Sequence, residues 1–179
     1  MRQGERGYSL LELLAVVIIL GVAAAVAIPD ISTTNPNKLD LAAEEVAQAI
    51  RFARSESLRT GQPHGFRQQS SAKRIRVFRH DTSATPWVPI YDIYHPTSKQ
   101  LYDIELDTQS FASADSVSRT PTFRGICNKT GNIYFDAAGI PRCADPETVL
   151  LEQFDVTLTL GNHIRVVTLN GITGRVTVQ

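Results

Sequence analysis

Residues 8–28 read YSLLELLAVVIILGVAAAVAI, and every position in this run is apolar or small except Ser9 and Glu12. As an α-helix, these 21 residues would span roughly 31 Å, at about 1.5 Å per residue. That length matches the hydrocarbon core of a bilayer, which is about 30 Å thick. The run therefore predicts a transmembrane helix over residues 8–29, preceded by a short leader over residues 1–7.

The leader is polar and basic, and it carries Arg2 and Arg6. Because cytoplasmic flanks are enriched in such bases, we expect the N-terminus in the cytoplasm and the chain beyond the apolar run on the other side. An ordinary secretory signal is the alternative, since Ala23, Ala25 and Ala27 imitate its small-residue cleavage site. The run is longer than in such signals, which favours an uncleaved anchor or cleavage ahead of the run.

Residues 6–13, RGYSLLEL, resemble the type III signal of type IV prepilins. By this resemblance Gly7 ends the leader, Tyr8 is the first mature residue in place of the usual Phe, and Glu12 takes the position of the family's glutamate. Pro29 stands where pilins often carry a helix-bending proline. The resemblance implies that a membrane prepilin peptidase cuts between Gly7 and Tyr8 and then methylates the new amine of Tyr8.

Three later stretches are similar to the GspH/FimT family: residues 53–57 (ARSES), residues 133–136 (IYFD) followed by Gly139, and residues 173–176 (TGRV). This likeness implies a minor pilin of a type IV pilus or a pseudopilin of a type II secretion system. Such a subunit would be anchored in the bacterial inner membrane with its head in the periplasm. Its implied partners are other pilins or pseudopilins, the prepilin peptidase, the inner-membrane assembly platform and the lipid bilayer.

A second helix is predicted within residues 30–60, after a bend near Pro29 and Pro36. Asn37 is expected to start this helix, with Asp40 as an acidic residue in the first turn. Gly61 and Pro63 are expected to end it. Apolar residues recur at helical spacing and predict a face that packs on a core; they are Leu39, Ala42, Val46, Ala49, Ile50 and Ala53.

Residues 61–179 predict a β-rich head, because the apolar period changes from helical spacing to two. The alternating positions include Ile75, Val77, Phe78, Ile104, Leu106, Val156, Leu158 and Leu160. Gly161-Asn162 and Asn170-Gly171 read as turns between strands. Residues 82–99 are expected to form a long connection that holds Trp87, Tyr91 and Tyr94. The expected fold is α+β, with a helix packed on an antiparallel sheet.

Glu12 is the residue expected to matter most for assembly, because a carboxylate inside an apolar span is costly unless it is paired. By the resemblance, its partner is the N-terminal amine of a neighbouring subunit. A buried ion pair adds little net stability but penalises wrong registers, so the pair would set the stagger between helices. The alternative is that Glu12 only snorkels to the membrane interface.

Cys127 and Cys143 are the only cysteines. If the head lies outside the cytoplasm, a disulfide between them is expected. The enclosed loop of 15 residues would be stabilised by about 3 kcal/mol in the chain-entropy model. Two free or redox-active thiols are the alternative.

The charges are balanced overall, with 18 basic and 18 acidic residues, so no whole-chain charge points to nucleic acid. They are unevenly placed, because residues 57–80 are basic and residues 81–118 are mostly acidic. Arg74 and Arg76 share one face of a strand, and Asp103, Glu105 and Asp107 share another. We expect these two faces to lie on neighbouring strands and to pair.

A DNA-binding minor pilin is the alternative function, with Arg74, Arg76 and Arg175 as the possible contacts. In the family this role is associated with a C-terminal Gly-Arg-x-Arg motif. Here the second arginine is replaced by Thr177, which weakens the transfer. A third alternative is a membrane-anchored periplasmic domain that never assembles.

No enzyme activity, cofactor or metal is expected. The four histidines are scattered without ligand spacing, and the cysteines form no C-x-x-C pair. No nucleophile with a matching base and no phosphate-binding glycine loop stands out. The expected role is therefore structural.

Overall fold

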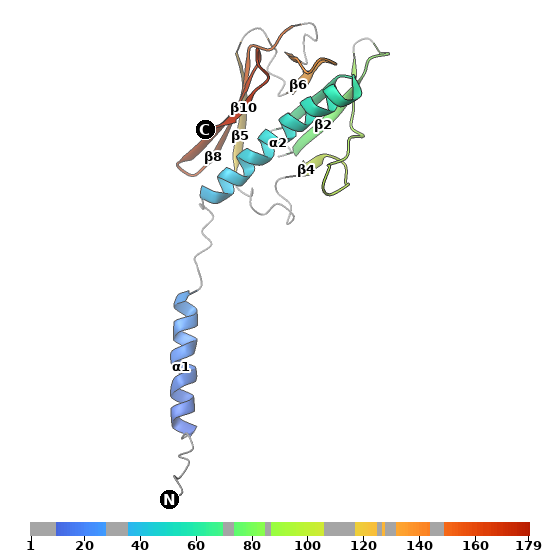
Figure 1. Cartoon of the computed structure of the whole chain (residues 1–179). Helices are drawn as coiled ribbons and strands as arrows, with labels where there is room; N and C mark the ends of the chain where they lie inside the picture. The colour runs from blue at the N-terminus through green and yellow to red at the C-terminus, as the bar shows by residue number, and fades with distance from the viewer. Residues whose placement is uncertain are drawn as a thin grey trace, which may run out of the picture. The chain divides into compact units, whose positions relative to one another are not determined.

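The computed structural model describes residues 10–27, 36–69, 74–84, 87–105, 117–124, 127, 132–143 and 149–179. The chain divides into two compact units, residues 1–32 and residues 33–179. Each unit is described by itself (Figure 1). The second predicted helix and the strands belong to the same unit, which we call the head.

The first unit contains helix α1 (Leu10–Ala27), whose sequence is apolar all round apart from Glu12. Large apolar side chains cover its described surface, and Leu10, Leu11 and Ile19 are among the most exposed. Among the described residues, no helix reaches the length and apolarity needed to cross a membrane. The predicted span over residues 8–29 is therefore not confirmed, and Tyr8 and Pro29 lie outside the described residues.

Helix α2 (Pro36–Thr60) is the long element of the head. It begins at Pro36 and not at the predicted Asn37, because proline is well accommodated at the first helical position, where its missing N–H would have no partner. It ends where predicted: the N–H of Gly61 donates to the Ser57 carbonyl at 2.9 Å, and Gly61 has a positive φ. The predicted apolar stripe is buried along its whole length.

The strands form two antiparallel sheets that flank α2. The first has the order β3-β2-β1-β6-β7, with β4 also paired to β2, and the second has the order β10-β9-β8-β5. The strand bounds in the first sheet are β1 (His64–Gln69), β2 (Arg74–Asp81), β3 (Val88–Ile90), β4 (Asp103–Glu105), β6 (Asn132–Phe135) and β7 (Pro141–Cys143). Those in the second are β5 (Ser118–Arg124), β8 (Gln153–Leu160), β9 (His163–Asn170) and β10 (Val176–Val178).

Both predicted turns are confirmed. Gly161 and Asn162 form the two-residue link between β8 and β9. At the end of β9, the Asn170 carboxamide oxygen accepts the N–H groups of Ile172 and Thr173, and so shapes the loop that leads to β10. This loop covers residues 171–175.

One continuous core joins the helix to both sheets. Figure 1 shows α2 running along the head, with β2 and β4 on one side and β8 and β10 on the other. Phe66 of β1 and Phe154 of β8 meet edge to face, with ring centroids 6.2 Å apart, so the two sheets also contact each other. The expected α+β architecture is confirmed, with two sheets in place of the single one.

A second, smaller cluster lies on the face of the first sheet that points away from α2. Phe78, His80 and Tyr134 pack there in edge-to-face contacts, and Trp87 covers them. Residues 82–99, predicted as a long connection, therefore pack partly on the sheet and contribute strand β3. Tyr94 in the same segment is exposed.

The two cysteines are joined by a disulfide in the structure, with Cα atoms 5.4 Å apart. Both residues are buried, and both belong to the core that α2 completes. Cys143 ends β7, so the bond ties Cys127 to the end of the first sheet.

His80 makes the stability of the head depend on acidity. The side chain is 6% exposed, and neither ring nitrogen has a hydrogen-bond partner among the described residues. Burial, with a smaller contribution from the charge of His64, lowers the pKa of His80 to about 4. The folded chain therefore holds His80 in the neutral form. Because the unfolded chain binds this proton more readily, acidification below both pKa values lowers the free energy of unfolding by on the order of 3 kcal/mol.

We expect this stabilisation to be present above about pH 6.5 and to be lost as the pH falls toward 4. His80→Phe keeps a ring in the cluster and should reduce the loss of stability between pH 7.5 and pH 4.5. The measurement is urea unfolding of the detergent-solubilised chain at both values, with His163→Gln at an exposed position as the control. An unchanged acid sensitivity in His80→Phe would contradict the assignment.

Candidate functional site

Glu12 lies in the first turn of α1 and is the only charged residue of that helix. A carboxylate at this end of a helix is favoured by the helix dipole. Its neighbours along the helix are exposed leucines, so the carboxylate is a single charged group on an apolar helix surface. Gly7 and Tyr8, the predicted cleavage and methylation positions, lie outside the described residues.

In the head, Arg54 brings together the three stretches that carried the second resemblance. From α2, its Nε donates to the Gly139 carbonyl at 3.2 Å and its Nη1 donates to the Gly174 carbonyl at 3.0 Å. These two carbonyls belong to the turn between β6 and β7 and to the loop before β10. One side chain thus holds residues that are 85 and 120 positions away along the chain.

Both contacted loops depend on glycine at the point of approach. Gly139 and Gly174 have φ values of 72° and 64°, in the left-handed region that favours glycine. A Cβ at Gly174 would lie 2.7 Å from the Arg54 guanidinium carbon, and one at Gly139 would lie 2.9 Å from a Leu58 methyl group. Glycine therefore permits α2 to approach both loops.

Ser57, one turn further along α2, makes a parallel connection. Its buried hydroxyl accepts the N–H of His64 at 3.2 Å and lies 3.2 Å from the Phe135 carbonyl and 3.0 Å from the Ala53 carbonyl. The helix is tied in this way to the first residue of β1 and to the end of β6. Ser57 was recognised only as part of the motif at residues 53–57, and no contact was predicted for it.

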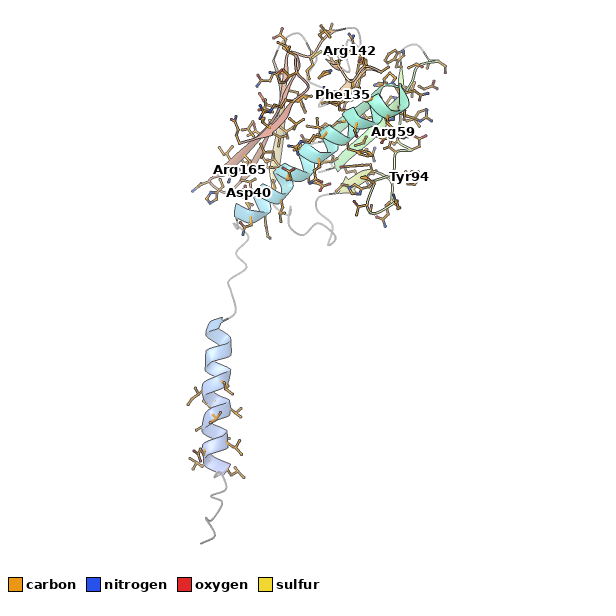
Figure 2. All side chains as sticks on the ribbon, viewed as in Figure 1. Asp40, Arg59, Tyr94, Phe135, Arg142 and Arg165 are labelled. Atoms are coloured by element: carbon orange, nitrogen blue, oxygen red, sulfur yellow. A yellow bond between two sulfur atoms is a disulfide. The ribbon has the colours of Figure 1, made fainter. Side chains whose placement is uncertain are left out.

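The start of α2 is tied to the second sheet by charge. Asp40 was predicted as an acidic residue of the first turn, and this was wrong, because α2 already begins at Pro36 and has no acidic residue in its first turn. Asp40 instead accepts a hydrogen bond from Arg165 of β9 at 2.6 Å. Figure 2 labels the two residues next to each other, beside the start of α2. Sequence reasoning did not single out Arg165, because its partner lies 125 positions away.

The predicted pairing of basic and acidic strands is confirmed. β2 and β4 are antiparallel neighbours, with Arg74 opposite Glu105 and Arg76 opposite Asp103. The Arg76 guanidinium lies 3.0 Å from the Asp103 carboxylate, and this hydrogen bond raises the pKa of Arg76. Asp107 lies outside the described residues. Arg175, the third possible DNA contact, is exposed in the loop before β10.

The described part of the chain holds no group of three or more His, Cys, Asp or Glu side chains that could bind a metal ion. The structure contains an apolar helix, α1, with one carboxylate, and a head in which α2 is bound to both sheets. This combination defines a pilin-like protein.

The comparisons with known proteins agree with that class. Residues 42–174 match the family model for type II transport protein GspH, and residues 2–28 match the prokaryotic N-terminal methylation motif. The chain therefore belongs to the GspH family, whose members are minor pseudopilins or minor pilins.

Type II secretion system protein H of Escherichia coli is 29% identical over 119 residues, which cover 63% of this chain and 69% of that protein. Two solved structures share the fold. The minor pseudopilin EpsH of Vibrio cholerae has a TM-score of 0.54 at 12% identity, over 82% of this chain and 95% of that chain. The type IV minor pilin FimU of Pseudomonas aeruginosa has a TM-score of 0.51 at 16% identity, over 83% and 92%.

Removal of the Arg54 side chain tests the link between α2 and the two loops. Arg54→Ala leaves the carbonyls of Gly139 and Gly174 without their charged donor, so we expect a loss of about 2–3 kcal/mol in the free energy of unfolding. Denaturant unfolding of the detergent-solubilised chain is the measurement.

Arg59→Ala is the matched control, because Arg59 lies on the same helix and, within the described part of the chain, its charged partner is Glu56 three residues earlier. A solvent-exposed pair of this kind contributes little to stability, so only a small loss is expected. Equal losses in the two variants would show that Arg54 does not fasten the loops.

Proposed function

We propose that this chain is a structural subunit that is processed at its N-terminus and then joins a type IV pilus or a type II secretion pseudopilus. The observation that carries the proposal is the order of the two matches: an N-terminal methylation motif over residues 2–28 stands directly ahead of a GspH head over residues 42–174. An apolar α1 with one carboxylate lies in the first segment.

Before assembly, the chain is held in the inner membrane by one pass of its N-terminal apolar run. The leader with Arg2 and Arg6 stays in the cytoplasm, and the head is exported to the periplasm. The disulfide between Cys127 and Cys143 supports a periplasmic head, since disulfides persist in oxidising compartments.

Assembly then requires prepilin peptidase to cut between Gly7 and Tyr8 and to methylate the amine of Tyr8. The freed amine is positively charged, and Glu12 of the next subunit is its proposed partner. Apolar helices can slide past one another at little cost. A single ion pair in apolar surroundings removes that freedom, because every wrong stagger leaves a charge unpaired.

Binding of DNA for uptake is the competing function, and the geometry of the head does not favour it. A phosphate track needs basic side chains whose charges are available. Arg76 is paired with Asp103, and its guanidinium also lies over the Tyr91 ring at 5.0 Å. Arg79 is likewise bound by Asp92 at 2.8 Å.

The first test concerns processing. Intact-mass measurement of the membrane-extracted protein should show a chain that starts at Tyr8 and carries one added methyl group. A Gly7→Val variant should retain Met1, because the peptidase would no longer accept the position before the cut. A mature chain that starts after Ala27, or a wild-type chain that keeps its leader, would contradict the proposal.

The second test concerns register. Glu12→Ala should leave the cleavage and the fold of the head intact and should reduce incorporation into sheared filaments by at least about tenfold, since an unpaired amine would remain in apolar surroundings. Quantitative immunoblotting of filament and membrane fractions gives the ratio. Asp92→Ala, which removes an exposed carboxylate of the head, is the control. Normal incorporation of Glu12→Ala would reject the pairing.

A further inference from the structure

Two adjoining hollows flank the loop of residues 171–175 on the surface of the head. The first, which we call the basic hollow, has a volume of about 320 Å³ and is lined by Arg51, Arg54, Ser55, Leu58, Arg175 and Val176 together with Gly174. The second, the apolar groove, has a volume of about 580 Å³ and is lined by Ile140, Leu150, Leu151, Glu152, Gly171 and Ile172.

The basic hollow gathers three guanidinium groups, and its lining residues in the described part of the chain include no acidic one. Arg51 is bound by Glu44 at 2.7 Å, outside the lining. Arg54 is held by two backbone carbonyls, which fix its position but do not neutralise its charge. Arg175 is exposed at the rim. A positive charge fixed in this way favours the binding of an anion such as a carboxylate.

The apolar groove gathers large side chains that a folded head would otherwise bury. Ile172 is 91% exposed, Leu150 is 58% exposed and Ile140 is 41% exposed. Single exposed apolar residues need no explanation, but a contiguous set around one hollow marks an interaction site. Among the described residues that line the groove, Glu152 is the charged one.

The hollows form one surface. The loop of residues 171–175 supplies Ile172 to the groove and Arg175 to the basic hollow. Leu58 lines the basic hollow and packs against Gly139, the residue before Ile140 of the groove. A ligand seated on this surface would therefore meet apolar side chains along one part and guanidinium groups at the adjacent part.

We propose that this surface docks a segment of a neighbouring subunit in which apolar side chains are followed by a carboxylate. The apolar side chains fill the groove, and the carboxylate enters the basic hollow beside Arg54 and Arg175. This inference rests on the proposed assembly function, and it assigns a contact made by the head in addition to that of Glu12.

A protein segment fits this surface better than a nucleic acid does. The larger of the two hollows is apolar, and Glu152 on its lining would repel a phosphate backbone. Nucleic-acid binding depends on several available basic side chains along a track, whereas one of the three arginines of the basic hollow, Arg51, is already bound by Glu44. Burial of Ile172, Leu150 and Ile140 would supply the non-directional part of the affinity.

The test uses the full chain in its host. Benzoylphenylalanine in place of Ile172 should form an ultraviolet-induced adduct in intact cells, and mass spectrometry should identify it as a subunit that carries its own N-terminal methylation motif. The cross-linked peptide should hold apolar residues next to an Asp or a Glu. The same photoreactive residue in place of Tyr94, exposed elsewhere on the head, should give less than about a tenth of that yield.

Charge variants complete the test. Arg175→Glu should lower the adduct yield from position 172 by at least about tenfold, whereas Arg175→Lys, which keeps the positive charge, should retain most of the wild-type yield. In both variants, intact mass should still show a chain that starts at Tyr8. An adduct with nucleic acid, an adduct that Arg175→Glu leaves unchanged, or no adduct in cells that form filaments would overturn the docking proposal.

The outcome is separable from that of the assembly proposal. If Glu12→Ala blocks incorporation but position 172 forms no adduct in the wild-type background, assembly stands and the docking surface is wrong. If Glu12→Ala incorporates normally while position 172 still gives the expected adduct, the head contact stands and the register role of Glu12 is wrong.

Discussion

Burial of one face of α2 between two sheets is the constraint on which the head depends. Leu39, Val46, Ile50 and Ala53 lie on that face, and all four are almost fully shielded from water. Because the core is shared, neither sheet could keep its inner face dry without the helix. The polar contacts of Arg54, Ser57 and Asp40 are then placed by the packed helix, and they fix the loops and strands that the apolar contacts leave free to shift.

Sequence reasoning recovered what is local and periodic. The stripe of α2, the end of the helix at Gly61 and the β8–β9 turn at Gly161-Asn162 follow from spacing and turn chemistry within a few residues. The pairing of Arg76 with Asp103 could also be predicted, because alternation assigns each residue to a face and opposite charges favour neighbouring strands.

Contacts between distant segments were beyond such reasoning. Nothing in the local pattern of ARSES indicates that Arg54 donates to carbonyls 85 and 120 residues away, although the glycines that receive it were already visible in the other two motifs. The division into two sheets was missed for the same reason, since strand order depends on long-range packing. The short strand β3 was missed because prolines and turn residues dominate residues 82–99, and tertiary pairing with β2 overrides that local preference.

The two charged features that carry the functional argument act by different physics. Glu12 lies on an apolar helix, where an unpaired carboxylate is costly, so its proposed contribution is to exclude wrong arrangements of neighbouring subunits. Arg54 is half-buried and Arg175 is exposed, so a pair of opposite charges contributes modestly there and the orientation of the two groups matters more. A subunit with only the Glu12 ion pair could fix the axial offset between neighbouring helices, but it could not distinguish one pilin-like neighbour from another. The proposed docking surface, which combines apolar anchors with a positioned positive charge, would supply that distinction, because a partner that lacks the carboxylate would leave the guanidinium groups desolvated without a counter-charge.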